Sequence, residues 1–412
     1  MNTIASVTLP HHVHAPRYDR QQLQSRIVHF GFGAFHRAHQ ALLTERVLNA
    51  QGGDWGICEI SLFSGDQLMS QLRAQNHLYT VLEKGADGNQ AIIVGAVHEC
   101  LNAKLDSLAA IIEKFCEPQV AIVSLTITEK GYCIDPATGA LDTSNPRIIH
   151  DLQPPEEPHS APGILVEALK RRRERGLTPF TVLSCDNIPD NGHVVKNAVL
   201  GMAEKRSPEL AGWIKEHVSF PGTMVDRIVP AATDESLAEI SQHLGVNDPC
   251  AISCEPFIQW VVEDNFVAGR PAWEVAGVQM VNDVLPWEEM KLRMLNGSQK
   301  LPQRMLAGIR IHLGRETDWS LLALGVAGWM RYVSGVDDAG KAIDVRDPLS
   351  DKIRDLVAGS SSEQRVTALL SLREVFGDDL PDNPHFVQAI EQAWQQISQF
   401  GAHQALLNTL KI

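Results

Sequence analysis

The feature that most constrains the fold of this chain is a short apolar segment that runs directly into a glycine-rich turn. The segment RIVHF (Arg26–Phe30) has the pattern of a buried strand. The sequence that follows, up to Leu48, is rich in alanine and leucine at helical spacing. Between them stands GFGAFHRAH, residues 31–39. A strand, a tight turn and a helix in this order predict the first βα unit of a nucleotide-binding α/β domain.

Apolar segments alternate with helical ones over the following two hundred residues or so. Helices are expected at 105–115 and 163–175, and strands at 55–62, 78–82, 91–101, 120–126 and 180–185. The second and third of these strands are candidates for an antiparallel pair. The alternation predicts a doubly wound, Rossmann-like α/β domain whose sheet is covered on both faces.

The sequence pattern changes near Trp287. Helical periodicity dominates beyond it, with helices expected at 288–295, 302–313, 321–333, 366–376 and 383–400. We therefore expect three parts, which are a loose N-terminal arm at 1–22, a Rossmann-like domain at 23–285 and a smaller helical domain at 286–412. A length of 412 residues also favours two domains over one.

Composition excludes several classes of partner. The net charge of −14 repels phosphate backbones, so we expect no nucleic acid, and no apolar segment is long enough to span a membrane. Seven dispersed cysteines and the lack of a signal-peptide pattern favour a reducing cytoplasm. Cys250 and Cys254 lack the partners of a zinc site, so no metal is expected, and nothing favours a particular oligomeric state.

The glycine turn predicts a dinucleotide site. Gly31 permits the tight turn, Gly33 lets the backbone approach a pyrophosphate, and the helix start offers unpaired N–H groups. The usual third glycine is missing, and a tight βα turn with nothing bound is the alternative interpretation. The predicted cofactor contacts are Gly31, Phe32, Gly33, Ala34 and Phe35.

An acidic residue near the end of the second strand would bind the ribose 2′-hydroxyl of NAD. Glu59 and Asp66 are the candidates, and Asp66, in the loop SGDQ, is preferred because Glu59 could simply be a strand residue. That loop contains no arginine to meet a 2′-phosphate, so NAD is favoured over NADP.

Polar side chains also follow later strands. Asn187 in SCDN could donate a hydrogen bond to a developing alkoxide, or it could cap the helix expected near Asn191. Asp226 lies beside Arg227 in MVDRIVP, where a salt bridge between them is the structural alternative. The segment LTITEKGY, residues 125–132, ends a strand in the same way.

Lys291 and Asn296 form the pair that most resembles catalytic machinery. A lysine whose pKa is depressed by burial can pass a proton at neutral pH, and an asparagine can hold an oxyanion. The pattern alone is weak, because a lysine on a helix is usually solvated.

Six motifs along the chain together resemble the mannitol dehydrogenase family of polyol-specific long-chain dehydrogenases. They are GFGAFHRAHQ, SLTITEKGY, SCDNIPDNGH, TMVDRIVPA, CEPFIQWVVEDNF and KLRMLNGS. The resemblance covers nearly the whole chain. The phrases WGICEI, TEKGYC and DPCAISCEPF are most similar to the fructuronate reductase (D-mannonate oxidoreductase) branch of that family.

The resemblance implies a Rossmann-like domain, a helical domain and an active site in the cleft between them. Lys291 would be the general acid and base, and Asn187 and Asn296 would form the oxyanion hole. Asp226 would lie beside the cleft and Glu288 near the lysine.

The implied reaction interconverts D-mannonate and D-fructuronate with NAD as the hydride carrier and without a metal. Mannitol or another polyol is the alternative substrate. Lys300 or Arg304 could meet the carboxylate of a sugar acid.

The sequence departs from the family after Asn296. The family's active-site helix reads lysine, four residues, asparagine, two residues, histidine, whereas this chain has Gln299 at the last position. A second family phrase, GSQKLPQRM, normally lies well downstream, and here it shares Gly297 and Ser298 with the first. The simplest interpretation is an internal deletion that removed the catalytic histidine and several helices.

Such a deletion would expose apolar faces that packed on the lost helices, at about 25 cal/mol per Å². We expect the Rossmann-like half to fold and bind NAD, and turnover to be strongly reduced. A catalytically silent, nucleotide-binding protein is the alternative from another functional class.

Overall fold

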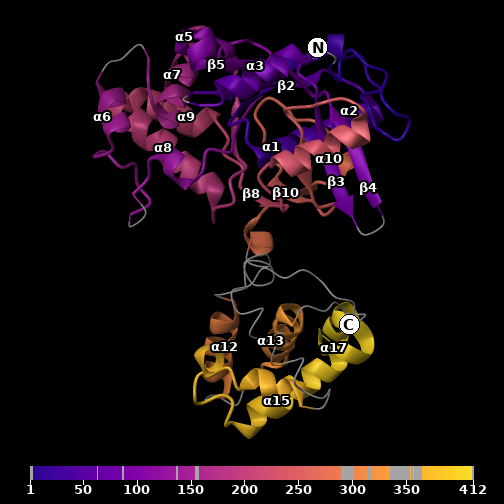
Figure 1. The fold of residues 1–412 in the computed structure, drawn as a ribbon. Coiled ribbons are helices and arrows are strands. Elements are labelled where there is room, and N and C mark those ends of the chain that lie inside the picture. The colour runs from indigo at the N-terminus through magenta and orange to yellow at the C-terminus, as the bar shows by residue number, and fades with distance from the viewer. Residues whose placement is uncertain are drawn as a thin grey trace. The chain divides into compact units, whose positions relative to one another are not determined.

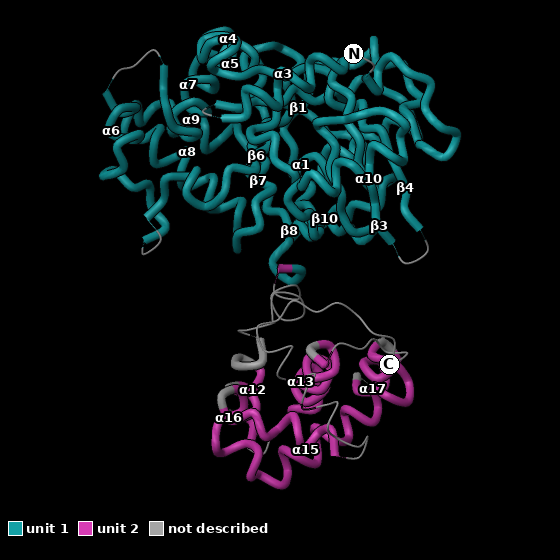
Figure 2. Tube along the Cα trace, in the orientation of Figure 1, with its two compact units in different colours: residues 1–287 teal, residues 288–412 magenta. Residues whose placement is uncertain are grey.

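The computed structural model describes residues 3–288, apart from 63, 86–87, 136–137 and 154–156, and then 301–313, 318–334, 353, 356 and 364–410. The chain divides into two compact units (Figure 2), unit 1 at Met1–Trp287 and unit 2 at Glu288–Ile412. The hydrophobic clusters of the described residues are each confined to one unit.

A five-stranded sheet in the order β5-β2-β1-β6-β7 forms the centre of unit 1 (Figure 1). All its neighbouring strands are parallel, so their carboxyl ends meet at one edge. The strands are β1 (Gln24–Phe30), β2 (Trp55–Ser61), β5 (Val97–Asn102), β6 (Ile122–Leu125) and β7 (Thr181–Ser184). This sheet confirms the predicted doubly wound fold.

Both faces of this sheet are buried, because successive strand residues point to opposite sides. Ile27 and Ile57 belong to one hydrophobic cluster, whereas Val28 and Cys58 belong to the other. The helices that pack on the first face are α2 (Gln40–Gln51) and α3 (Asp66–Ala74); those on the second are α5 (Leu108–Phe115), α7 (Ala161–Glu174) and α8 (Asn191–Arg206).

Two three-stranded sheets complete the strand structure of unit 1, in the orders β4-β3-β9 and β11-β10-β8. β3 and β4 are antiparallel, as the sequence suggested, and β10 is antiparallel to β8. Their strands are β3 (Tyr79–Gly85), β4 (Gly88–Val94), β8 (Thr223–Asp226), β9 (Ile252–Cys254), β10 (Gln259–Glu263) and β11 (Gln279–Val281).

The single strand expected at 91–101 was wrong, because two strands of different sheets share that segment. β4 ends at Val94 and β5 begins at Val97. The carboxylate of Glu45 accepts hydrogen bonds from the backbone N–H groups of Gly95 and Ala96, at 2.8 and 2.9 Å. These bonds satisfy the backbone where the chain passes from one sheet to the other.

Two expected helices are broken by one residue each. The helix after the glycine turn consists of α1 (Ala34–Ala38) and α2, which meet at His39 with φ −120° and ψ −97°. The helix expected at 105–115 consists of α4 (Ala103–Asp106) and α5, separated by Ser107 with φ +83°. Other described helices of unit 1 include η1 (Arg20–Gln22), η2 (Glu129–Tyr132), α6 (Pro146–Leu152), α9 (Pro208–His217), α10 (Asp234–Leu244) and η3 (Trp273–Ala276).

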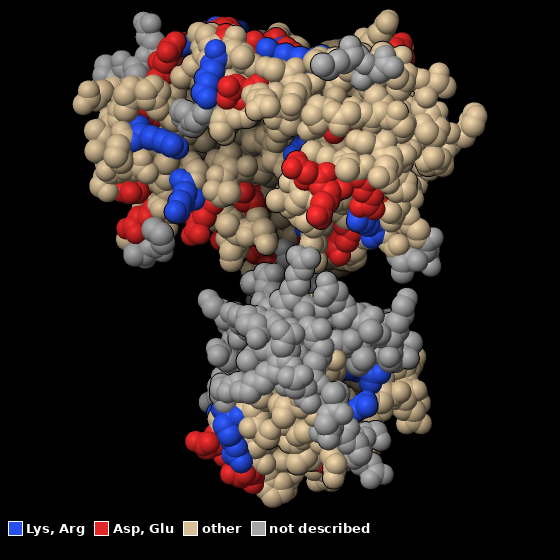
Figure 3. Space-filling view, in the orientation of Figure 1, with Lys and Arg blue, Asp and Glu red and all other residues tan. Residues whose placement is uncertain are grey.

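The N-terminal segment is packed rather than loose. Ile4 and Val13 are buried in a cluster with residues of β4 and α10. On the face of unit 1 drawn in Figure 3, both signs of charge are interspersed, and acidic side chains gather over α10.

The regular structure described in unit 2 is helical, and its helices share one core that includes Leu306, Met330, Phe376 and Phe386. The helix expected at 366–376 is two helices, α15 and α16, and most of the one expected at 288–295 lies outside the described residues. The helices whose bounds are described are α12 (Leu301–Leu313), α13 (Ser320–Val333), α15 (Arg365–Leu370), α16 (Arg373–Phe376) and α17 (Pro384–Leu410).

Candidate functional site

The glycine turn lies at the carboxyl edge of the five-stranded sheet, and its first glycine is required by geometry. Gly31 follows β1 directly, and its N–H donates to the carbonyl oxygen of Ile60 at 3.0 Å. Its φ is +109°, and a Cβ there would lie 2.4 Å from the carbonyl oxygen of Thr126. No residue with a side chain fits both conditions.

Gly33 faces open space instead. Its backbone is extended, with φ −80°, and it caps the start of α1. A Cβ there would have no neighbour closer than the carbonyl oxygen of Gly31, at 4.0 Å. The turn therefore offers backbone to a space that a side chain would fill, which fits the pyrophosphate of a dinucleotide.

The aromatic rings of the turn have packing partners within unit 1. Phe32 is 7% exposed, and its ring meets Tyr79 edge-on with centroids 5.8 Å apart. Phe35 stacks on His39 at 4.7 Å. Of the predicted cofactor contacts, Phe32 therefore offers its backbone rather than its ring.

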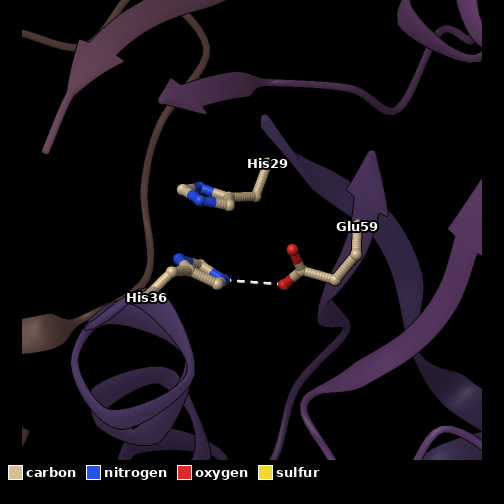
Figure 4. Close-up of side chains that lie close together, drawn as sticks. All are labelled: His29, His36 and Glu59. Carbon is tan, nitrogen blue, oxygen red and sulfur yellow. Dashed lines mark hydrogen bonds and ion pairs between the residues drawn. The ribbon is translucent and has the colours of Figure 1, made fainter. Parts of the chain in front are cut away.

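A buried polar cluster lies directly behind the turn (Figure 4). Residue 29 in β1 is in register with Glu59 in β2 and with Ser124 in β6, so the three side chains share one face of the sheet. His36 comes from α1 and shares a hydrogen bond with Glu59, with Nε2 and Oε1 2.6 Å apart. The rings of His29 and His36 stack, with centroids 3.3 Å apart and planes 12° apart.

Burial governs the protonation of this cluster. Both side chains of the His36–Glu59 pair are fully buried. Burial raises the pKa of Glu59 from 4.5 to about 7 and lowers that of His36 from 6.5 to about 3, because each neutral form avoids desolvation. Between about pH 3 and 7 the pair therefore holds one proton, whichever of the two bonded atoms carries it.

His29, His36 and Glu59 are close enough to suggest a metal site, with candidate ligand atoms within 4.8 Å of one another. Both ring nitrogens of His29 already have partners, however: Nδ1 meets Ser124 Oγ at 2.7 Å, and Nε2 meets Gly31 O at 3.1 Å. A metal would have to displace these bonds and part the stacked rings, so we interpret the cluster as support for the turn.

Glu59 is therefore not the ribose ligand that the sequence allowed, since it is fully buried against His36. Asp66 is the better candidate. It is the first residue of α3, its side chain is 45% exposed, and it forms an ion pair of 3.0 Å with Lys104. The hydrogen bond from Lys104 lowers the pKa of Asp66 below its usual value, so the carboxyl group is ionised at neutral pH.

Asn187 is exposed at the same edge, just after β7, and it does not occupy the cap position of α8, which Asp190 fills. The residue before it, Asp186, is held firmly. Its carboxylate accepts hydrogen bonds from Ile127 N at 3.0 Å, Thr128 N at 2.9 Å and Tyr132 Oη at 2.6 Å. These bonds tie the chain at Asn187 to the loop that follows β6.

Asp226 ends β8 and is partly exposed. The alternative of a salt bridge between it and Arg227 does not hold, because the Arg227 guanidinium forms an ion pair with Glu83 and donates to the carbonyl oxygen of Ala38. Arg227 is 6% exposed and serves the packing of unit 1.

The remaining predicted residues belong to unit 2. Glu288 is 8% exposed, and Arg304 lies in α12, although its side chain falls outside the described structure. The other predicted residues, which are Lys291, Asn296, Gln299 and Lys300, lie wholly outside the described residues.

The sequence reasoning missed the buried roles of His29, His36 and Ser124. Their signal was a polar residue one or two positions before the end of each of three apolar strands, at His29, Glu59 and Ser124. In a parallel sheet such positions become neighbours, which a reading of one segment at a time does not reveal.

Two family models match the chain, the mannitol dehydrogenase Rossmann domain at residues 25–275 and the mannitol dehydrogenase C-terminal domain at residues 296–398. The chain is 83% identical to the uncharacterized oxidoreductase YeiQ of Escherichia coli (strain K12), over all of both proteins. It is 47% identical to D-mannonate oxidoreductase of the same organism, over 98% of this chain and 99% of that protein.

A solved structure of similar fold is the ternary complex of Pseudomonas fluorescens mannitol 2-dehydrogenase with NAD and D-mannitol. It has a TM-score of 0.68 and 34% identity, and the match covers 98% of each chain. A substrate-free D-sorbitol dehydrogenase has a TM-score of 0.73 and 30% identity, over 96% of this chain and 98% of that one. Among the described residues, no helix is long and apolar enough to cross a membrane.

The alignment with YeiQ runs over 488 positions and takes in the whole of both proteins, whereas this chain has 412 residues. The relative therefore contains residues with no counterpart in this chain, as an internal deletion requires. The position of the deletion, at Gly297 and Ser298, stays a prediction. With both of its domains matched by family models, the chain belongs to the mannitol dehydrogenase family of oxidoreductases.

Proposed function

We propose that this chain is an NAD-dependent oxidoreductase of the type that interconverts D-mannonate and D-fructuronate. The observation that carries the proposal is the edge of the sheet, where Gly33 faces open space and Asp66 follows the second strand. The 47% identity to D-mannonate oxidoreductase over nearly all of both chains favours this substrate pair over mannitol. Glucuronate catabolism is the corresponding metabolic context.

In this proposal the residues of unit 1 hold the cofactor. The backbone of the turn at Gly31 and Gly33 binds the pyrophosphate, and the Asp66 carboxylate accepts from a ribose hydroxyl. NAD supplies the acceptor for the hydride that leaves the substrate carbon. Asn187, at the same edge, donates to the oxygen on that carbon as it gains negative charge.

The proton chemistry falls to unit 2. Lys291 takes the proton of the substrate hydroxyl during oxidation and returns it during reduction, and Asn296 shares the oxyanion with Asn187. In this proposal Lys300 or Arg304 binds the substrate carboxylate.

Two further residues complete the proposed substrate site. We assign Asp226, at the end of β8, to the substrate side of the cleft, and Glu288 to the vicinity of the lysine, where it would link Lys291 to solvent.

A second candidate function is favoured by Gln299 and by the missing residues. A glutamine cannot take up a proton as histidine does. The shortened chain would then bind the dinucleotide through unit 1 with little or no turnover on any sugar acid.

One experiment separates the two functions. Purified protein is titrated with NADH by fluorescence, and NADH oxidation is then followed by absorbance with D-fructuronate and, for comparison, D-fructose. Binding with turnover on D-fructuronate supports the enzyme, and binding with turnover only on D-fructose moves the substrate to mannitol. Binding without turnover supports the impaired form, and failure to bind NADH overturns both.

A further inference from the structure

Asp66 is fixed at the carboxyl end of β2 by the loop before it. β2 ends at Ser61, and the Ser61 hydroxyl bonds to the carbonyl oxygen of Ser64. A Cβ on Gly65 would lie only 3.3 Å from Ser61 Oγ, so the loop folds back on the strand end. The Asp66 carboxylate therefore stands where this fold receives the ribose that carries adenine.

Lys104 is brought to the same place by the neighbouring strand. β5 lies beside β2, and its last residue, Asn102, is in register with Ser61. The buried Asn102 side chain donates to Ser64 O at 3.1 Å and accepts from Lys104 N at 2.9 Å. One asparagine thus holds both loops, and the Lys104 Nζ to Asp66 Oδ1 distance is 3.0 Å.

These contacts place a cation within reach of the ribose position, although the loop SGDQ itself contains none. The cation is the Lys104 ammonium, and the Asp66 carboxylate balances its charge. A 2′-phosphate brought to this position would meet the Asp66 carboxylate as well as the ammonium, so repulsion offsets the attraction. Without the carboxylate, the ammonium would be available to the phosphate.

We propose that Lys104 is a latent 2′-phosphate partner whose charge is balanced by the Asp66 carboxylate, and that this carboxylate makes the site select NAD over NADP. The inference rests on the proposed function, because it requires that unit 1 bind a dinucleotide. The inference names Lys104 as a second residue that determines nucleotide specificity, beside Asp66. It also predicts that the site accepts NADP once the Asp66 carboxylate is removed.

The test measures the Kd of NADH and of NADPH for the full-length chain by fluorescence titration, in the wild type, Asp66→Asn, Lys104→Met and the double variant. We expect the wild type to prefer NADH, and Asp66→Asn to bind NADPH roughly tenfold more tightly than the wild type, the scale of one charge-assisted hydrogen bond. Adding Lys104→Met should remove that gain, and Lys104→Met alone should give none. The gain should also shrink with added salt.

The matched control is the Lys84–Glu239 ion pair, which has a distance of 2.7 Å and side-chain exposures of 46% and 33%. Glu239→Gln removes a carboxylate from a similarly exposed pair outside the nucleotide edge and should leave the NADH to NADPH ratio unchanged. If the double variant binds NADPH as tightly as Asp66→Asn does, Lys104 is not the partner and this inference is overturned while cofactor binding stands. If the wild type binds neither nucleotide, the proposed function fails together with the inference.

Discussion

Gly31 and Gly33 are two residues apart, but different constraints favour glycine at each. The fold requires glycine at 31, whereas the proposed cofactor requires it at 33, and alanine substitutions can separate the two effects. Gly31→Ala places a methyl group against Thr126 at a φ of +109°, and we expect it to lower the free energy of unfolding by roughly 1–3 kcal/mol. Gly33→Ala meets open space, so stability should change by less than about 0.5 kcal/mol. NADH affinity should nevertheless fall, because the methyl group occupies the space proposed for the pyrophosphate.

Urea unfolding and NADH titration of both variants check this prediction. A Gly33→Ala protein that binds NADH as the wild type does would show that the pyrophosphate lies elsewhere. A Gly31→Ala protein of unchanged stability would contradict the geometry of the turn.

The proton held by the His36–Glu59 pair should make the free energy of unfolding depend on pH. Between about pH 4.5 and 6.5 the pair holds one proton in both the folded and the unfolded chain, so it adds no slope to stability. Below 4.5 its contribution falls, because the unfolded chain takes up a second proton before the folded one does. It also falls as pH rises from 6.5 towards 7, because the unfolded chain releases its proton first.

Glu59→Gln leaves His36 as the only titrating member of the pair. Since burial lowers the pKa of His36, the variant should lose stability relative to the wild type as pH falls below 6.5, by at most about 1.4 kcal/mol per pH unit. Urea unfolding at about pH 5 and 7.5 measures the difference, with Glu239→Gln as an exposed control. Parallel pH profiles for Glu59→Gln and the wild type would refute a shared proton.

At the scale of elements, Asp186 ties the end of β7 to the loop after β6. Asp186→Asn turns one acceptor into a donor that faces a backbone N–H group in either orientation of the amide, and we expect a loss of roughly 1–3 kcal/mol in the free energy of unfolding. Tyr132→Phe removes a hydroxyl but keeps the ring, so its cost should be smaller. Chemical denaturation of both variants measures this order, and the reverse order would contradict it.

Sequence pattern predicted the elements whose signal is local. The apolar strands, the glycine turn and the main helices were placed within a few residues, because their periodicity lies within each segment. The breaks at His39 and Ser107, and the division at Gly95 between two sheets, could not be placed in this way. His39 and Gly95 have tertiary partners, which are the carbonyl oxygen of Gln259 and the Glu45 carboxylate. Ser107 instead caps α5 locally, by accepting from the N–H of Ala110.

The residues of the candidate site also fall into those with a local sequence signal and those fixed by tertiary contacts. The glycine turn and Asp66 follow from short-range rules, which fix a turn after the first strand and an acid after the second. The exclusion of Glu59 required His36, and the partner of Arg227 proved to be Glu83, far away in sequence. Such contacts are set by strand register and packing, which one segment does not carry.

At the scale of the whole molecule, each unit has its own hydrophobic core. The clusters of unit 1 contain no residue beyond Trp287, and the cluster of unit 2 contains none before Met305. We therefore expect two separable unfolding transitions in calorimetry. We also expect residues 1–287, expressed alone, to fold and to bind NADH with an affinity close to that of the full chain.

Circular dichroism and NADH titration of that fragment provide the check. A single cooperative transition in the full chain, or a fragment that remains unfolded, would show that the units depend on one another.

The separate core of unit 1 also makes it a cassette for building biosensors. A module that captures a dinucleotide and leaves it chemically unchanged reports how much of it is present, whereas an active enzyme would deplete what it measures. Unit 1 ends at Trp287, before Lys291 and Asn296, so unit 1 expressed alone would lack the residues proposed for turnover and is a starting scaffold for a probe of cellular redox state.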